Sequence, residues 1–193
     1  MINELENITV LQFFWLPMDE LLQQYNLLKM LKQSDNLKDK KADSMLMQPY
    51  SMIVKLKKYY SNLTPEAMVT MVKMVFGIEN EVQMQFKIVE YFPAVNFIVN
   101  GLDKIIELEV KRLTSQPKEE LLMAGVEKMQ VYGDLNTIDQ LAGGDMLKWN
   151  EIEKMPWQYV FTKLCMEKDR AEIQENYSEI IRLKNQPQNA HSW

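Results

Sequence analysis

Cysteine and histidine are almost missing from this chain of 193 residues, which contains one of each, Cys165 and His191. One cysteine cannot form an internal disulfide, and one histidine in a polar tail cannot build a Ser-His-Asp or Cys-His catalytic group. Soft-metal sites and the Glu-x-x-His pairs of di-metal helical bundles need more of both residues. This composition predicts no metal, no cofactor and no catalytic residue, so we expect a protein that is not an enzyme.

Glycine-rich phosphate loops are missing as well. Neither Gly-x-Gly-x-x-Gly nor Gly-x-x-x-x-Gly-Lys-Ser/Thr occurs, and the pair Gly143 and Gly144 follows no predicted strand. Nucleotide binding is therefore not expected. An enzyme built only from Glu, Lys and Tyr stays open, and a buried cluster of these residues in a cleft, with strongly shifted pKa values, would indicate one.

The chain also lacks an uninterrupted apolar run and the pattern of a signal peptide. Its most apolar stretch, Phe92 to Val110, is interrupted by six polar or charged residues, each of them costly in a bilayer. We expect a core helix there and no membrane contact. The first residues show no basic region, apolar segment or small-residue cleavage site, so we expect maturation in a reducing cytoplasm.

Strand patterns are nearly absent, whereas helical spacing of apolar residues recurs along the chain. No sustained alternation of apolar and polar residues occurs, and no Asn-Gly or Asp-Gly turn separates two β-branched runs. The polar segment from Gln33 to Asp43 is typical of a solvated loop or a frayed helix end. The pattern predicts an all-α fold, a multi-helix bundle.

Local signals mark several helix boundaries. Thr64 is a good N-cap with Pro65 at the first helical position, and Gly77 suits the end of the same helix. The next helix is expected from Glu79 to Tyr91. Pro93 is then expected to start a new, apolar helix.

Glycines punctuate the later part of the chain. A helix is expected from Ser115 to about Gly133, and residues 133–147 contain three glycines, typical of a hinge. We therefore expect a helical core domain over residues 1–132, a glycine-containing hinge over 133–147, and a long C-terminal helix with a polar tail over 148–193.

The last predicted helix starts at Pro156 and changes character halfway. Its first half is apolar along one face, and its second half is mostly charged until apolar residues resume at helical spacing. About 28 residues would span ~42 Å, too long for a compact domain of this size, so we expect the second half to project. An apolar stripe there needs a partner surface. The candidate protein–protein interface comprises Trp157, Phe161, Ile173, Tyr177, Ile180 and Ile181.

Basic residues are concentrated in one segment. Between Lys29 and Lys58 there are eight lysines and three acidic residues, whereas residues 59–193 carry a net charge of −6 and the whole chain −5. This pattern is typical of a solvated face, and the alternative is a basic patch facing DNA or the acidic surface of a neighbouring copy. The candidate patch comprises Lys29, Lys32, Lys38, Lys40, Lys41, Lys55, Lys57 and Lys58.

The segments Leu141 to Trp149 (LAGGDMLKW) and Met155 to Phe161 (MPWQYVF) resemble small all-helical proteins from the head–tail and tail-assembly regions of tailed bacteriophages. The likeness is greatest to crAss-like and other phages of gut bacteria. It implies a ring or connector subunit of the virion, assembled in the host bacterial cytoplasm. The implied partners are copies of itself in a ring, the portal, and other connector or tail proteins.

Two further functions stay open. The same resemblance is compatible with a tail assembly chaperone that coats the tape-measure protein and leaves before the particle matures. The 15 methionines would suit such a role, because methionine adapts to varied partner surfaces. A small DNA-binding regulatory protein would instead use the basic segment between Lys29 and Lys58.

Overall fold

The computed structural model describes residues 5–116 and 119–185, and these residues are mainly helical. Within those ranges the strands are one antiparallel pair of two residues each, β1 (Asn36–Leu37) and β2 (Lys40–Lys41), inside the segment expected to be a loop. The all-α prediction is confirmed. His191 and the rest of the tail from residue 186 lie outside the described residues.

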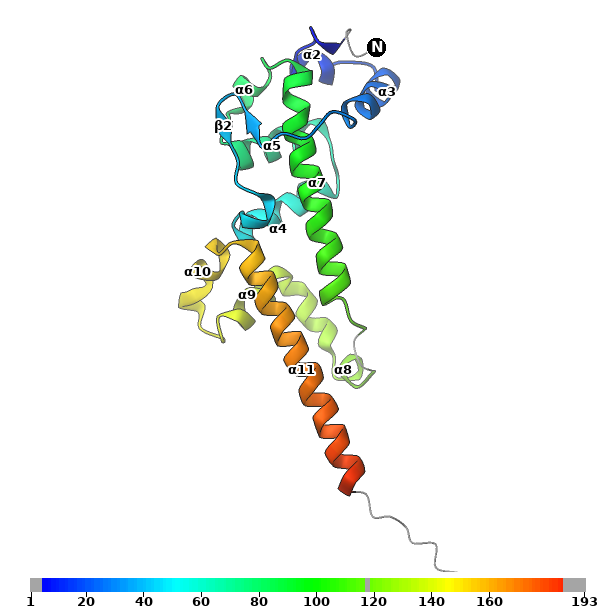
Figure 1. Ribbon diagram of the computed structural model, residues 1–193, viewed down its shortest axis with the longest axis vertical. Coiled ribbons are helices and arrows are strands. Elements are labelled where there is room, and N and C mark those ends of the chain that lie inside the picture. Colours follow the sequence, from blue (N-terminus) through cyan, green and yellow to red (C-terminus); the bar gives the residue numbers. More distant parts are fainter. Residues whose placement is uncertain (1–4, 117–118, 186–193) are drawn as a thin grey trace, which may run out of the picture.

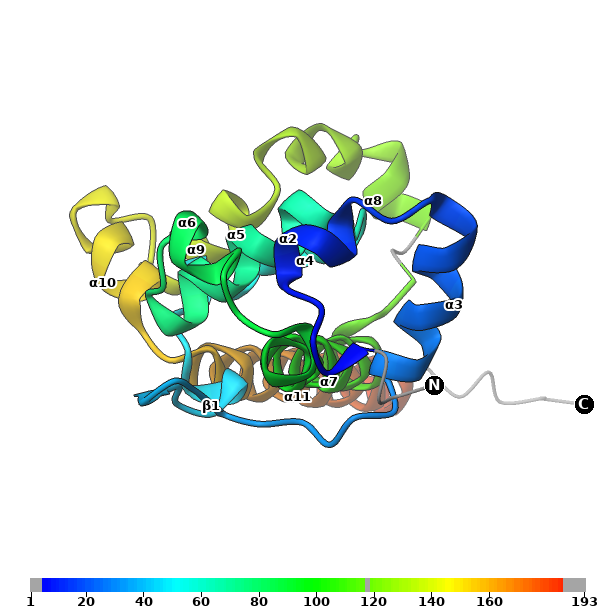
Figure 2. The same cartoon turned by 90° about the horizontal axis from the view of Figure 1, so that it is seen from above.

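Short helices surround one long helix in the N-terminal half (Figure 1). The long helix is α7 (Ile88–Leu113), and many of its apolar side chains are buried. Seen from above, most of the short helices lie on one side of it, while the segment leading to β1 crosses the other side (Figure 2). The surrounding elements are α2 (Val10–Phe14), α3 (Met18–Leu28), η1 (Met45–Met47), α4 (Tyr50–Tyr60), α5 (Pro65–Phe76) and α6 (Asn80–Gln83).

The predicted boundaries of α5 are confirmed. The Thr64 hydroxyl accepts a hydrogen bond from the Ala67 backbone N–H at 3.2 Å, and Pro65 is the first helical residue. Gly77 ends the helix with φ 65°, a left-handed conformation that favours glycine. The helix then buries one apolar face, including Met71 and Val72, against α7 and α4.

The predicted break at Pro93 is wrong. α6 ends at Gln83, and α7 begins at Ile88 and continues through Pro93. A proline inside a helix costs about 3 kcal/mol because it removes a hydrogen bond and crowds the preceding turn. Phe92 and Val95, buried beside it, each gain about 1.5–3 kcal/mol from burial. The summed burial of this apolar segment therefore outweighs the proline penalty.

Buried amides fix the ends of the shorter helices. The Asn96 amide of α7 donates to the backbone carbonyls of Leu28 and Leu31, each at 3.0 Å, and so satisfies the C-terminal end of α3. The Gln83 amide donates to the carbonyl of Ile78 at 2.7 Å, and its oxygen accepts the Tyr91 hydroxyl proton at 2.9 Å. Each buried polar group thus joins α7 to a neighbouring element.

The chain after α7 forms an arm, which we define as residues 119–148. The helix expected from Ser115 to Gly133 is wrong in its middle, because Gly125 adopts φ 85° and the chain turns there. A helix also occupies most of the segment predicted as a hinge, and the division into domains stays a prediction. The arm contains α8 (Glu119–Met123), η2 (Val126–Tyr132), α9 (Asp134–Leu141) and η3 (Met146–Lys148).

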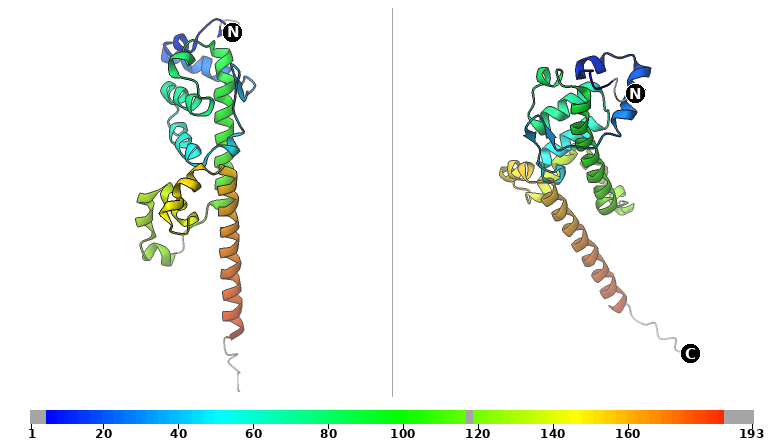
Figure 3. Two further views of the ribbon diagram at one scale, coloured as in Figure 1. Left: turned by 90° about the vertical axis from the view of Figure 1, so that its left-hand side faces the viewer. Right: turned by 45° about the horizontal axis from the view of Figure 1, so that its top comes forward.

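The last helix is long and projects, as predicted. After α10 (Trp149–Lys154), α11 runs from Trp157 to Asn185, 29 residues or about 44 Å. Its first part packs against α7 and α4, and every residue from 169 to 185 is exposed. Figure 3 shows the outer part standing clear of both the arm and the N-terminal half.

Gly101 provides a test of how closely α7 approaches η1. A Cβ atom at this position would lie 2.3 Å from Cγ and 2.6 Å from Cβ of Met45. We expect Gly101→Ala to lower the free energy of unfolding, because overpacking costs about 1–3 kcal/mol. That cost exceeds the gain of about 1 kcal/mol from the better helix propensity of alanine. Urea denaturation measures the change.

Lys104→Ala is the matched control, since Lys104 is exposed on the same helix one turn away. Its effect should stay within about 0.5 kcal/mol. A Gly101→Ala variant more stable than the wild type would contradict the close approach of the two elements.

Candidate functional site

The carboxylate of Glu109 joins three helices where α11 begins. Lys57 of α4 donates to both of its oxygens, at 3.0 and 2.9 Å, and the indole N–H of Trp157 in α11 donates to Oε1 at 3.0 Å. The Lys57 and Glu109 side chains are about one-quarter exposed. Because the pair is sheltered and charge-assisted, it holds α4, α7 and α11 together more strongly than a surface ion pair would.

Backbone hydrogen bonds fix the start of α11 at the same place. The Tyr50 N–H donates to the Met155 carbonyl at 2.8 Å, and the Trp157 N–H donates to the Gln48 carbonyl at 2.9 Å. These bonds form a bridge between Pro49 and Pro156, the residues that precede α4 and α11. The direction in which α11 leaves is thus set by both backbone and side chains.

A cavity of about 380 Å³ lies beside the Glu109 carboxylate. Tyr50, Thr137 and Glu109 bring polar groups to it, and Trp157 and Phe161 line it with stacked rings whose centroids are 4.7 Å apart. Together with Lys57 they form a cluster of Glu, Lys and Tyr side chains, which is the kind of cluster that an enzyme of this composition would need. Glu109 already accepts three hydrogen bonds there, so its carboxylate serves the junction between helices.

The phenol of Tyr50 is held in its neutral form. Burial, followed by the charge of Asp134, raises its pKa to about 12; a hydrogen bond with Thr137 opposes the shift, and Glu109 adds to it. A phenol with this pKa stays protonated at neutral pH, so it can donate a hydrogen bond but does not act as a general base. That the protein is not an enzyme stays a prediction.

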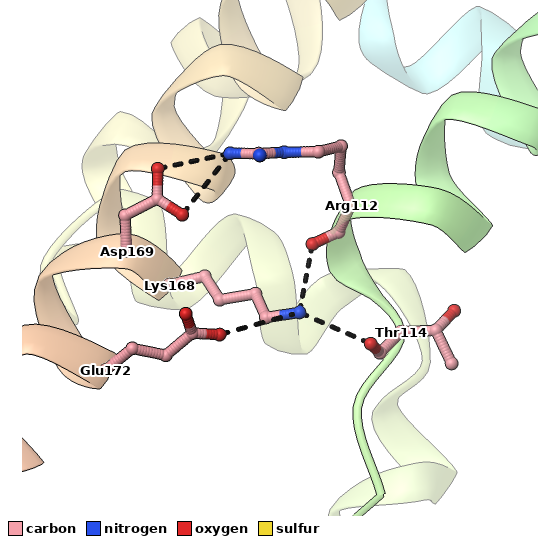
Figure 4. A network of polar contacts seen from close by, with 5 residues as sticks. All are labelled: Arg112, Thr114, Lys168, Asp169 and Glu172. Carbon is pink, nitrogen blue, oxygen red and sulfur yellow. Dashed lines mark hydrogen bonds and ion pairs between the residues drawn. The ribbon is translucent and has the colours of Figure 1, made fainter. Parts of the chain in front are cut away.

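A second polar network fixes the middle of α11 to the end of α7 (Figure 4). The ammonium group of Lys168 donates to the carbonyls of Arg112 and Thr114, at 3.0 and 3.3 Å. The Arg112 guanidinium donates to both carboxylate oxygens of Asp169, at 3.1 and 3.3 Å. A cation at a helix C-terminus satisfies free carbonyls and opposes the helix dipole. Beyond this network α11 leaves the fold.

The structure divides the six residues predicted as a protein–protein interface. Trp157 is a correction, because its side chain is 2% exposed and belongs to the core. Phe161 is half-buried and stacks on it. The other four, which we call the outer stripe, are exposed on the projecting part of α11, with Ile173 67% and Tyr177 59% exposed; the outer stripe comprises Ile173, Tyr177, Ile180 and Ile181. Binding of a partner by this stripe stays a prediction.

The predicted basic patch is spread over three parts of the N-terminal half. Lys29 and Lys32 lie at and after the end of α3, Lys38 to Lys41 in the β1–β2 hairpin, and the rest in α4. Several are engaged within the chain. The Lys29 ammonium lies 4.4 Å from the ring centroid of Tyr25, that of Lys38 lies 4.0 Å from that of Phe86, and Lys57 pairs with Glu109. A patch formed by all eight lysines is not supported, and Lys40, Lys41, Lys55 and Lys58 stay exposed.

The arm presents a second exposed apolar surface that sequence reasoning missed. Met123, Val131 and Leu147 are each more than 80% exposed, although all three are residue types normally found inside proteins. A groove of about 360 Å³ lies beside α9 and is lined by Met129, Tyr132, Leu135, Asn136, Asp139 and Trp149. The sequence predicted one helix over most of this segment, with its apolar side chains facing the core, and therefore did not predict an exposed apolar surface.

Comparison of this chain with protein-family models, curated proteins and solved structures found no match. Among residues 5–116 and 119–185, no group of three or more His, Cys, Asp or Glu side chains is arranged to hold a metal ion. In the same part of the chain, no helix is both long and apolar enough to cross a membrane.

Removing the charge of Glu109 tests the junction of the three helices. We expect Glu109→Gln to lower the free energy of unfolding by about 1–3 kcal/mol, because Lys57 loses its anionic partner in a sheltered position. Urea denaturation measures it. Glu107→Gln is the control on an exposed position of the same helix and should change little. Equal effects of the two substitutions would argue against the junction.

Alkaline titration tests the environment of Tyr50. Its pKa in the folded protein is raised above the ordinary value of 10.0 to about 12, so the folded state favours the neutral phenol. The resulting stabilisation is complete below pH 10 and is lost as the pH rises from 10 to 12. The free energy of unfolding, measured at several pH values, should fall over that window.

The control for this titration is Tyr50→Phe, which removes the ionising group. Its fall in stability between pH 10 and 12 should be smaller, although not zero, because a hydrogen bond to Asp103 also raises the pKa of Tyr60 to about 12. An identical pH dependence in wild type and variant would contradict the assignment.

Proposed function

We propose that this chain is a non-enzymatic structural protein of a tailed-phage particle, a multi-copy ring or connector subunit at the head–tail or tail junction. The observation that carries the proposal is the outer stripe, a row of large apolar side chains on a helix that projects from the fold. Exposed apolar rows of this kind mark protein interaction surfaces. The phage setting rests on the resemblance of the segments Leu141 to Trp149 and Met155 to Phe161.

The size of the stripe supports a subunit with more than one neighbour. Burying its four large side chains would gain about 1.5–3 kcal/mol each, whereas association costs about 4–15 kcal/mol in lost freedom of motion. The stripe alone is thus close to break-even, so the surface that covers it has to contribute further contacts. A ring, in which every copy makes contacts on two sides, adds contacts that one short helix lacks.

The shape of the molecule supports the same role. Two polar networks, around Glu109 and around Lys168, hold α11 at a fixed position on the fold. Lys168 also pairs with Glu172 one turn further along, and Arg182 pairs with Glu179 in the outer part of the helix, which adds a small stabilisation. A stiff projection with a fixed direction suits a subunit that must place its neighbour at a defined angle.

The runner-up is a tail assembly chaperone, and the exposed methionines favour it. Met30, Met123 and Met146 are among the most exposed apolar side chains, and methionine adapts to varied helical clients. Mass spectrometry of purified particles separates the two functions, because a chaperone should be absent and a ring subunit present in many copies. A DNA-binding role is favoured least, since Lys57 is held by Glu109.

The oligomeric state of the purified full-length chain tests the proposal. We expect light scattering to give a mass of several copies, and we expect the double substitution Ile173→Asp and Ile180→Asp to shift it to one copy. Charges on the stripe would remain buried and unpaired in the assembly. A wild-type chain that stays strictly monomeric at high concentration would contradict the ring function.

The matched control is Glu179→Lys with Arg182→Glu, which exchanges two charges at exposed positions of the same helix outside the stripe. It should assemble like the wild type. Thermal unfolding followed by circular dichroism verifies that both double variants retain the fold.

A further inference from the structure

The outer stripe faces away from the arm of its own chain. Leu164, Lys168 and Ala171 line a cavity that α11 shares with α9 and the end of α7. At about 100° per residue, Ile173 lies about 200° around the helix from Ala171, on the opposite side. Tyr177 and Ile180 continue along that side, and Ile181 lies at its edge. Its own arm therefore cannot cover it unless α11 separates from α7.

The face that carries the stripe is positively charged at both ends. Arg170 precedes Ile173 by three residues and Lys184 follows Ile180 by four, so both lie on the same face as the stripe. Both are exposed, and neither has an ion-pair partner within residues 5–116 and 119–185. Glu172 and Glu179 lie on other faces of the helix, and Asp169, four residues before Ile173, is paired with Arg112. A partner surface should therefore be apolar and acidic.

The arm has both properties. Over residues 119–148, ten large apolar side chains are exposed, and six acidic residues against two basic ones give a net charge of −4. Its groove of about 360 Å³ is lined by apolar side chains, among them Met129, Tyr132 and Leu135, together with the carboxylate-bearing Asp139. The arm thus complements the stripe in both apolar character and charge.

We infer that the outer stripe of one copy binds the groove of the arm of the next copy. The inference deepens the proposed function and depends on it, because it names the partner of the stripe within a multi-copy assembly. Pairing of two stripes is less favourable. In parallel it would place Arg170 against Arg170 and Lys184 against Lys184, and in antiparallel, centred on Tyr177, it would place Arg170 against Lys184. The arm offers opposite charge instead.

This contact joins unlike surfaces, so assembly proceeds head to tail. Each copy has one stripe and one groove, and an added copy again exposes one of each. Such an assembly ends only when it closes into a ring, and otherwise it grows as a filament. A contact between two stripes would instead stop at a dimer.

Complementation between two defective variants tests the inference. The stripe variant carries Ile173→Asp and Ile180→Asp, and the groove variant carries Met129→Asp and Tyr132→Asp. All four positions are exposed, so the fold should be retained. The control for the groove variant is Ala124→Asp with Gln130→Asp, exposed positions of the arm outside the groove. Native mass spectrometry and light scattering on full-length chains give the number of copies.

Head-to-tail binding predicts that each variant alone is monomeric at concentrations about thirtyfold above those at which the wild type assembles, as expected for loss of central contacts. An equimolar mixture should form a heterodimer of one chain of each variant and nothing larger. The groove variant still has an intact stripe, and the stripe variant still has an intact groove, so these two surfaces can bind each other. The two remaining surfaces are defective, so no further copy can bind. The control should assemble like the wild type.

A groove variant that assembles like the wild type would overturn the inference and leave the proposed ring function standing, because the copies would then meet through another surface. A mixture in which both variants stay monomeric would also overturn it. A monomeric wild type would overturn the proposed function itself. Circular dichroism of each variant excludes loss of the fold as the cause.

Discussion

The carboxylate of Glu109 is the contact on which the rest of this structure depends. It accepts hydrogen bonds from Lys57 and Trp157, so one side chain of α7 fixes both α4 and the start of α11. Leaving Lys57 without its partner would strand a cation in a sheltered position, so the three helices hold together or separate together. The backbone bridge between Pro49 and Pro156 adds a second constraint on the same helices. The direction of α11 follows from both.

A second constraint decides which face of α11 is free. Lys168 turns toward the last carbonyls of α7, and Leu164 and Ala171 lie on the same side of the helix, facing α9 and the end of α7, so that side is occupied. The rotation of a helix about its own axis is fixed once two neighbouring positions are held. Ile173 and Tyr177 therefore have to face away from the fold. The exposure of the stripe is thus a consequence of packing just over one turn earlier.

The sequence predicted those features that depend on local chemistry. Thr64 and Gly77 gave the ends of α5, because a cap needs only its own few residues, and the length of α11 followed from periodicity. The prediction at Pro93 was wrong, because the cost of a proline inside α7 is outweighed by burial against helices that are distant in the sequence. The prediction that Trp157 belongs to an interface was wrong for a related reason. Its helical spacing is the same whether the surface that covers it belongs to the same chain or to a partner. The apolar surface of the arm was missed because it appears only when α8 and η2 turn away from the core.

The two polar networks also bear on how copies would assemble head to tail. In such an assembly, the rotation from one copy to the next is set by the angle between the stripe and the arm of a single chain. The networks of Glu109 and Lys168 fix α11 on α7 by charge-assisted hydrogen bonds of definite direction, and Gln140 of the arm donates a hydrogen bond to Glu167 of α11 at 3.3 Å. A rigid angle gives every copy the same rotation, which a closed ring requires. A loose junction would let the rotation vary, and the copies would then form open chains of mixed length. The internal ion pairs of one chain would therefore determine the symmetry of the whole.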